Sequence, residues 1–185
     1  MHFKSSFIVF SAPSGAGKTT IVKRLAQKYN QLAISISATT REKRENEIDG
    51  REYHFLDKDR FLKAIQDGKF IEYEKVHGDY YGTLREKVDQ LLAQGRCILF
   101  DIDVNGAKSI KKYFPEAILI FIKPPSKEEL IERLKNRRES EQSINHRLKR
   151  LAYEYDEAQH FDHTVINDDL EKAIARVENI ILENK

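Results

Sequence analysis

A glycine-rich segment near the start of the chain, Ser11–Thr20 (SAPSGAGKTT), has the residue types that bind phosphate groups. It follows the apolar run Phe7–Phe10 and opens a stretch whose apolar residues have helical spacing. Its two glycines leave backbone N–H groups free to face an anion, and the helix that follows adds the positive end of its dipole. The segment predicts a P-loop, in which Lys18 reaches the β- and γ-phosphates and the Thr19 hydroxyl ligates Mg²⁺.

The loop differs from the Walker A pattern G-x-x-x-x-G-K-[ST] at its first position, where Ala12 replaces a glycine. The alternative is a glycine-rich turn between a strand and a helix, with a surface lysine. On the P-loop interpretation, the residues expected to contact ATP are Ala12, Pro13, Ser14, Gly15, Ala16, Gly17, Lys18, Thr19 and Thr20.

A P-loop also needs an acidic group on a neighbouring strand to position the metal. Asp101 ends the apolar run Cys97–Phe100 and is predicted to serve the Mg²⁺ site with Thr19, the carboxylate acting through water. Asp103 faces the same side while the strand continues. The alternative for Asp101 is a helix or turn cap before Gly106.

Short apolar runs alternate with amphipathic stretches along the chain, which is typical of an α/β fold with a parallel sheet. Strands are expected at Phe7–Phe10, Leu32–Ile36, Cys97–Ile102, Ile118–Ile122 and Thr164–Ile166. Helical spacing covers Lys18–Tyr29, Arg85–Gln94, a stretch opened by the capping box at Ser126, the stripe Ile144–Tyr155 and the stripe Leu170–Ile181.

Two segments depart from the alternation. The polar and aromatic segment Thr39–Gly82, with strand-like pieces at Tyr53–Leu56 and Phe70–Val76, predicts an inserted α+β lobe, and the basic segment Arg133–Arg150 predicts a mobile flap.

Length and charge narrow the class of protein. The 185 residues fit one domain, and 32 Lys+Arg against 30 Asp+Glu give no reason to expect a nucleic-acid or membrane partner. No apolar run approaches the ~18 residues of a membrane-spanning helix. Cys97 is the single cysteine, so no disulfide framework or multi-cysteine metal site is expected. A cytoplasmic globular protein is therefore predicted.

The chain resembles the guanylate kinase family of P-loop nucleoside monophosphate kinases, from Phe7 to about Ile181. The motifs that carry the resemblance are, in order, S-A-P-S-G-A-G-K-T, S-A-T-T-R-E-K-R, D-G-R-E-Y-H-F, F-I-E-Y, G-D-Y-Y-G-T, D-I-D-V-N-G, P-P-S and N-D-D. The resemblance implies transfer of the γ-phosphoryl group of MgATP to GMP or dGMP, by a monomer or homodimer. It also implies one domain over residues 1–185, with a parallel-sheet core (about 1–36, 84–125 and 151–185), a GMP-binding lobe (about 37–83) and a helical lid (about 126–150).

The same resemblance assigns the GMP phosphate to Arg41, Arg44, Tyr53 and Tyr81. Guanidinium groups offer paired donors to an anion, and phenols add single directed donors. The alternatives are core aromatics for the two tyrosines and a solvated charge cluster for the two arginines.

Base selection falls, by resemblance, to Ser37, Glu72, Thr83 and Asp103. A carboxylate such as Glu72 accepts both the N1–H and the 2-amino group of guanine, whereas adenine would oppose it with a lone pair. The hydroxyls of Ser37 and Thr83 can donate to guanine O6. Such a site penalises the wrong base by leaving polar groups unpaired.

The basic segment resembles the family's lid, whose arginines close over the ATP phosphates and spread the charge of the transition state. Arg133, Arg137 and Arg147 match these arginines and join Lys18 as expected catalytic residues. The alternative for Arg133 and Arg138 is a solvated basic helix face. The family usually has R-G-T-E here, whereas this chain has one residue fewer and reads Arg137-Arg138-Glu139-Ser140, so Arg138 is an alternative to Arg137. The motif Asn167-Asp168-Asp169 is either part of an adenine pocket or a helix N-cap.

Two other functions compete with the kinase. A guanylate-kinase-like scaffold domain would bind phosphorylated peptides and would typically lose the P-loop and lid arginines, but Lys18 and Thr19 are intact. A P-loop kinase of another phosphorylated substrate, such as a ribose phosphate, should lack the four base-reading residues.

Overall fold

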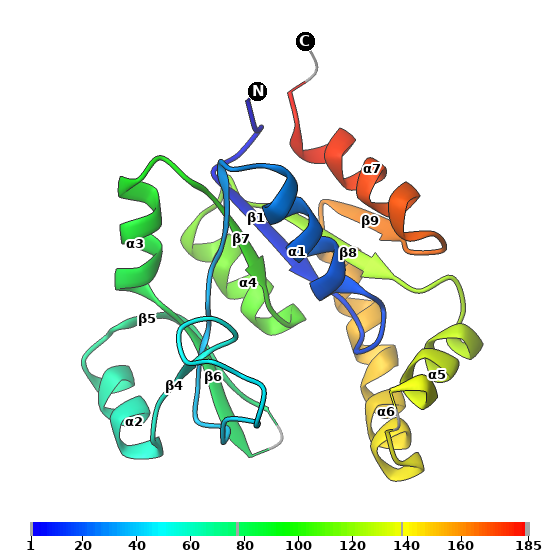
Figure 1. Cartoon of the computed structure of the whole chain (residues 1–185), viewed down its shortest axis with the longest axis horizontal. Helices are drawn as coiled ribbons and strands as arrows, with labels where there is room; N and C mark the ends of the chain where they lie inside the picture. Colours follow the sequence, from blue (N-terminus) through cyan, green and yellow to red (C-terminus); the bar gives the residue numbers. More distant parts are fainter. Residues whose placement is uncertain (1, 77, 138, 184–185) are drawn as a thin grey trace.

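The computed structural model of the chain describes residues 2–76, 78–137 and 139–183. A central sheet carries helices on both sides, and two arms extend from one end of it, away from the two termini (Figure 1). No helix within the described ranges is long and apolar enough to cross a membrane. The elements are β1 (Phe7–Ser11), α1 (Lys18–Lys28), β2 (Leu32–Ile34), β3 (Ala38–Thr39), β4 (His54–Phe55), α2 (Lys58–Gln66), β5 (Phe70–Val76), β6 (Asp79–Leu84), α3 (Arg85–Ala93), β7 (Cys97–Asp101), α4 (Val104–Tyr113), β8 (Ile118–Lys123), α5 (Lys127–Asn136), α6 (Glu141–Glu157), a 3₁₀ turn (Ala158–His160), β9 (His163–Ile166) and α7 (Leu170–Ile181).

The central sheet is parallel and has the order β2-β7-β1-β8-β9, which confirms the α/β prediction. Every residue of β1 is buried because helices cover both faces of the sheet. Phe10 of β1 is paired with Asp101 of β7. The glycine-rich loop after β1 and the carboxylate at the end of β7 therefore emerge together, at the carboxyl ends of neighbouring strands, where open α/β sheets bind ligands.

Alternate residues of β1 point to opposite faces of the sheet and meet different helices. Ile8 and Phe10 lie in a core formed with α1 and α7, whereas Phe7 and Val9 lie in a second core formed with α3 and α4. Two apolar layers thus hold the central strand and fix the start of the loop that follows it.

The first arm is the predicted inserted lobe, a four-stranded sheet of order β4-β3-β6-β5 with α2 against it. Phe61 of α2 stacks on Phe70 of β5 with ring centroids 4.4 Å apart, in a small core that includes Ala38. The sequence patterns did not indicate β3, β6 or α2, because β3 is only two residues long and polar residues interrupt β6.

The second arm contains the segment Arg133–Arg150, for which a flap and a helical lid were predicted. This segment consists of the last turn of α5, a short connection and the first part of α6. The two helices share a core of their own, made of Leu130, Leu134, Ile144 and Leu151. α5 begins as predicted, with the Ser126 hydroxyl accepting from the Glu129 N–H at 3.1 Å. The predicted lid boundary at residue 150 falls inside α6, which continues to Glu157.

Candidate active site

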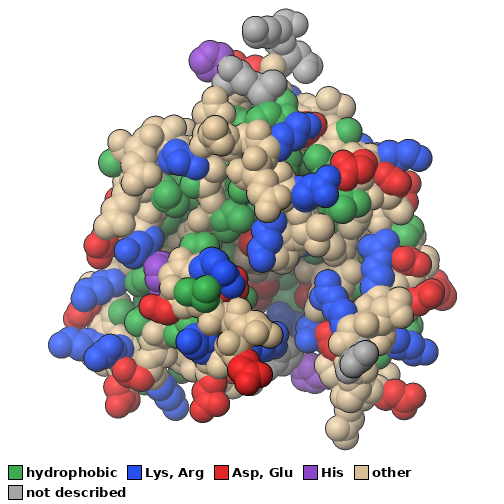
Figure 2. All heavy atoms as spheres, viewed as in Figure 1, with side chains coloured by type: hydrophobic (Ala, Val, Ile, Leu, Met, Phe, Trp, Pro, Cys, Tyr) green, Lys and Arg blue, Asp and Glu red, His purple; other side chains and the backbone are tan. Residues whose placement is uncertain are grey.

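A cavity of about 680 Å³ opens between the lobe and the α5–α6 arm. Figure 2 shows a hollow between the two arms, with Lys and Arg side chains on both sides of it. The predicted site residues that line the cavity are Ala12, Pro13, Ser14, Gly15, Gly17, Lys18, Thr19, Thr20, Ser37, Arg41, Arg44, Tyr53, Glu72, Tyr81, Asp101, Asp103, Arg137 and Arg147. Three predicted site residues, Ala16, Thr83 and Arg133, are not part of that lining.

The loop after β1 has the backbone that anion binding needs. Gly15 and Gly17 have φ of 95° and 92°, in the left-handed region that L-residues with a side chain rarely adopt. Gly17 is the N-cap of α1 and provides no side-chain acceptor, so the N–H groups of the first turn remain available for an anion. Ala16 is completely buried, and of this residue only the backbone can serve the loop.

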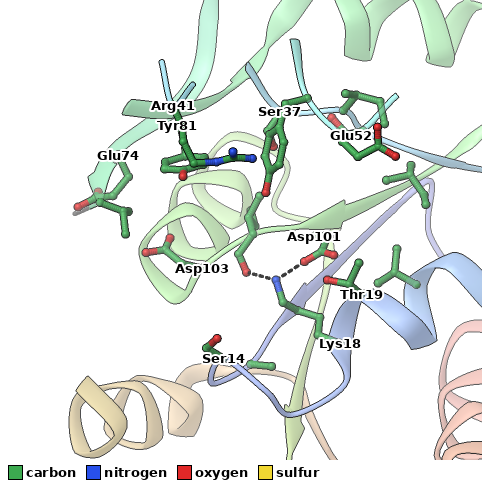
Figure 3. A pocket seen from close by; sticks show the side chains of 18 of the residues that line it. Ser14, Lys18, Thr19, Ser37, Arg41, Glu52, Glu74, Tyr81, Asp101 and Asp103 are labelled. Atoms are coloured by element: carbon green, nitrogen blue, oxygen red, sulfur yellow. Dashed lines mark hydrogen bonds and ion pairs between the residues drawn. The ribbon is translucent and has the colours of Figure 1, made fainter. Parts of the chain in front are cut away.

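Lys18 forms an ion pair with Asp101, and its ammonium also donates to the Ile102 carbonyl at 3.1 Å (Figure 3). Burial pushes the pKa of Asp101 upward, but the Lys18 charge and hydrogen bonds from Lys18 and Thr19 outweigh burial and keep that pKa below its ordinary value. Asp101 is therefore an ionised carboxylate beside the first residues of α1.

Asp103 lines the cavity from the start of a helix and not from the predicted continuation of the strand. β7 ends at Asp101, and Asp103 is the N-cap of α4, where its Oδ1 accepts from the Gly106 N–H at 2.9 Å. Asp103, not Asp101, thus fills the cap before Gly106. Its Oδ2 is buried and has no hydrogen-bond partner among the described residues, and the nearest cation is Arg150 at 3.6 Å.

Thr19 and Asp101 suit a magnesium ion that arrives with a nucleotide. They offer a hydroxyl and an ionised carboxylate at one edge of the cavity. Mg²⁺ prefers oxygen ligands and typically takes one or two protein groups, with substrate phosphates and water completing its octahedron. Across the described part of the chain, no three His, Cys, Asp or Glu side chains form a metal site. The donor set fits a substrate-borne Mg²⁺ better than a metal held by protein alone.

On the lobe side of the cavity, guanidinium and phenol groups gather. Arg41 lies over the ring of Tyr53 at 5.4 Å, and the Tyr53 ring packs edge-on against Tyr81 at 5.8 Å. The Arg41 Nη2 donates to Glu47 at 2.7 Å, and the Arg44 N–H donates to the other Glu47 oxygen at 2.8 Å. Glu47 thus occupies the Arg41 guanidinium that the resemblance assigns to a phosphate, whereas the bond from Arg44 comes from its backbone and not from its guanidinium.

Glu72 lies deeper in the lobe, with only 8% of its surface exposed. Burial raises its pKa to about 7, the negative charge of Asp103 adds to this, and the bond from Thr83 opposes it. The Thr83 hydroxyl donates to the Glu72 carboxylate at 2.6 Å. Since Thr83 is completely buried behind Glu72, it holds the carboxylate in place instead of facing the cavity, while Ser37 lines the cavity directly.

The three predicted lid arginines differ in their surroundings. Arg147 of α6 donates to the Ser14 hydroxyl of the loop and to Glu139, both at 2.6 Å. Arg137 lines the cavity just after α5. Arg133 instead pairs with Glu129 at 2.9 Å and donates to the Asn167 carbonyl at 3.1 Å. The alternative lid residue, Arg138, lies outside the described residues.

Two residues of α6 line the cavity although the sequence analysis did not assign them. Arg150 follows Arg147 by three residues and Glu154 follows Arg150 by four, so all three share one helix face. Burial raises the pKa of Glu154 to about 7, against the opposing charge of Arg150. The same helical spacing, extended forward from Arg147, would have found both.

The parallel sheet, the glycine-rich loop with its lysine and the opposed basic arms define a P-loop kinase. The guanylate kinase family model matches residues 4–184. The chain is 49% identical over 177 residues to the guanylate kinase of Chlorobium chlorochromatii, covering 95% of this chain and 93% of that one. It is 47% identical to that of Chlorobium luteolum, over 92% and 87% of the two chains. The crystal structure of guanylate kinase from Anaplasma phagocytophilum is similar, with a TM-score of 0.73 at 30% identity over 94% of this chain and 82% of that one. The chain belongs to the guanylate kinase family.

Proposed function

We propose that the protein transfers the γ-phosphoryl group of MgATP to GMP or dGMP and forms ADP and GDP or dGDP. The observation that carries this proposal is the pairing of two half-sites across one cavity. Lys18 and the loop glycines lie on one side, and buried Glu72 with Arg41 lies on the other. Such a cavity can hold a nucleoside triphosphate and a phosphorylated acceptor with their phosphates facing each other.

The reaction needs little covalent chemistry from the protein. A phosphate oxygen of GMP, already anionic, attacks the γ-phosphorus as the bond to the ADP oxygen breaks. No separate general base is required, so positioning and charge stabilisation provide the catalysis. Lys18 would move from Asp101 to the β- and γ-phosphates, while Arg137 and Arg147 would stabilise the charge on the transferred group. Thr19 and Asp101 would hold Mg²⁺, which supplies neutralisation of the phosphate charge when it is bound.

The residues of the lobe support a guanine nucleotide as acceptor. Glu72 accepts two adjacent donors when it is ionised, and guanine presents two such donors at N1 and the 2-amino group. Asp103 adds an acceptor whose Oδ2 has no hydrogen-bond partner among the described residues. The alternative of a ribose phosphate acceptor is opposed by the guanylate kinase relatives, which are 47% and 49% identical to this chain over 92% and 95% of its length.

A phosphopeptide-binding module is opposed by the P-loop side of the cavity. Lys18 is present, the glycine backbone is in place, and Arg147 of α6 already reaches Ser14 of the loop at 2.6 Å. The predicted cytoplasmic location and the monomeric or homodimeric state stay predictions from the sequence.

Product analysis tests the proposal directly. The purified protein, ATP, Mg²⁺ and GMP should yield equal amounts of ADP and GDP by anion-exchange chromatography. Lys18→Met should reduce turnover at least a hundredfold, because it removes a charge that stabilises the transferring phosphoryl group. ATP hydrolysis without GDP formation would contradict phosphoryl transfer to GMP.

A further inference from the structure

Asn167 lies at the end of β9 behind the glycine-rich loop, and only 6% of its surface is exposed. Three of its polar groups have partners. The backbone N–H donates to the Lys123 carbonyl at 2.8 Å, and the backbone carbonyl accepts from Arg133 at 3.1 Å. The side-chain Nδ2 donates to the Ala16 carbonyl at 2.8 Å. The side-chain amide is thus directed at the backbone of the loop, and Asn167 is not among the residues that line the cavity.

The bond from Asn167 determines the orientation of one peptide group in the loop. The Ala16 carbonyl and the Gly17 N–H belong to the same planar trans peptide and therefore point in opposite directions. An amide that holds the carbonyl on its own side turns the Gly17 N–H to the other side. Gly17 lines the cavity, and its φ of 92° is a backbone conformation that few residues adopt.

The Asn167 side-chain amide lies so close to the backbone of Gly17 that it leaves no room for a side chain at position 17. A Cβ on Gly17 would lie 2.3 Å from the Asn167 Nδ2. Arg133 holds the other end of the contact, because it donates to the Asn167 carbonyl from α5. Arg133, which does not line the cavity, is thus connected to the loop through Asn167.

We propose that Asn167 is a positioning residue for ATP, which clamps the Ala16–Gly17 peptide so that the Gly17 N–H faces the nucleotide phosphates. This inference rests on the proposed function, because it takes the loop to bind ATP. It separates Asn167 from its neighbours in the N-D-D motif. Asp169 caps α7 by accepting from the Lys172 N–H at 2.9 Å, and Asp168 pairs with Arg176 at 2.8 Å.

Two variants of nearly the same size test the clamp. Asn167→Leu removes the donor, and Asn167→Asp puts an acceptor opposite the Ala16 carbonyl. Titration calorimetry would measure the affinities for ADP, inorganic tripolyphosphate and GMP. Both variants should bind ADP and tripolyphosphate at least tenfold more weakly than the wild type, and GMP within twofold of it. Asn105→Leu, which removes a side-chain bond to Tyr153 outside the cavity lining, should leave all three affinities within twofold.

A pH series distinguishes the clamp from a general structural role. Below the pKa of the new carboxyl group, Asn167→Asp regains a donor toward Ala16, so its affinity for tripolyphosphate relative to Asn167→Leu should rise as pH falls from 8 to 5. Wild-type affinity in Asn167→Leu would overturn the clamp. Loss confined to ADP, with tripolyphosphate unaffected, would overturn it in favour of an adenine contact. Failure of the wild-type protein to bind ADP would instead overturn the proposed function itself, and the clamp with it.

Discussion

The ammonium of Lys18, the first residue of α1, pairs with the carboxylate of Asp101, the last residue of β7, and also donates to the Ile102 carbonyl. The pair joins two groups that the proposed reaction needs separately. Lys18 is needed at the nucleotide phosphates and Asp101 beside the metal. ATP binding must therefore exchange the Asp101 partner of Lys18 for phosphate oxygens.

Asp101→Asn tests this exchange. The amide keeps the size of the side chain but removes the negative charge, which pairs with Lys18 in the free protein and would attract Mg²⁺ in the complex. We expect kcat to fall about a hundredfold, within the range found when one charge-stabilising group is lost. Without Mg²⁺, ADP should bind as tightly as to the wild type or more tightly, because Lys18 is released. Asp59→Asn, on the exposed surface of α2, is the matched control, and a wild-type kcat in Asp101→Asn would contradict the assignment.

The raised pKa of Glu72 predicts that GMP affinity depends on pH. Glu72 titrates near pH 7, and only its ionised form accepts two donors from guanine. GMP affinity should therefore be full above pH 8 and should fall about tenfold per unit below pH 7. Glu72→Gln should bind GMP about ten- to a hundredfold more weakly at pH 8 and should retain only the pH dependence of the GMP phosphate itself. An unchanged pH profile in this variant would contradict the role of Glu72.

The same pKa affects folding, with a defined sign. The folded state raises the pKa of Glu72 from 4.5 to about 7, so it binds a proton more tightly than the unfolded chain does. Stability is therefore lost as pH rises between these values, by up to an amount on the order of 3 kcal/mol. Glu154→Gln is the matched control, because Glu154 titrates in the same window. Glu154→Gln should abolish the stability loss that comes from Glu154 itself. It should leave the loss that comes from Glu72, and the pH dependence of GMP binding, unchanged.

Arg137 and Arg147 are expected to act on the transition state. Both line the cavity beside the loop, and Arg147 already reaches Ser14. Arg137→Ala and Arg147→Ala should each lower kcat at least a hundredfold and change the Kd for GMP less than threefold. Steady-state kinetics and GMP titrations give both quantities. A severe loss in Arg138→Ala beside normal turnover in Arg137→Ala would instead place the lid arginine one residue later.

Gly17 and Ala12 should respond in opposite ways to substitution. Gly17→Ala forces a residue with a side chain into a backbone conformation of φ 92°, and its Cβ would lie 2.3 Å from the Asn167 Nδ2. ATP affinity should therefore fall at least tenfold. Ala12→Gly should leave kcat and KM for ATP within twofold, because Pro13 favours extended backbone at position 12. It should also lower the free energy of unfolding by up to about 1 kcal/mol, through a more flexible unfolded chain. A large gain of activity in Ala12→Gly would mean that the loop of this chain is compromised.

Most of the fold could be predicted from sequence patterns. The central strands are covered on both faces, so they read as continuous apolar runs such as Phe7–Phe10 and Cys97–Phe100. The patterns predicted each strand of the central sheet and five of the flanking helices, with α1 and α3 ending within one residue of the structure. α4 was not predicted, because its N-cap Asp103 was taken as a continuation of the strand.

The site depended on contacts between distant segments, which no local pattern reports. The bond from the Thr83 hydroxyl to the Glu72 carboxylate joins neighbouring strands of the lobe, so it forms only when the two strands pair. The bond from Asn167 to Ala16 spans 151 residues of sequence. Arg133 matched a lid arginine in type and spacing, yet its guanidinium donates to the backbone carbonyl of Asn167, just after β9, because the packing of α5 decides where it points.

Acceptor specificity is the sharpest test of phosphoryl transfer to a guanine nucleotide. A coupled assay of ADP formation would compare GMP, dGMP, IMP and AMP at fixed MgATP, with the wild-type protein and Glu72→Gln. GMP and dGMP should be the best acceptors, because only guanine fills both acceptor positions of Glu72. IMP, which lacks the 2-amino group, should have a kcat/KM about ten- to a hundredfold lower. AMP should be about 10⁴-fold lower, and Glu72→Gln should narrow these ratios. Equal or faster phosphorylation of AMP by the wild-type protein would contradict guanine selection by Glu72.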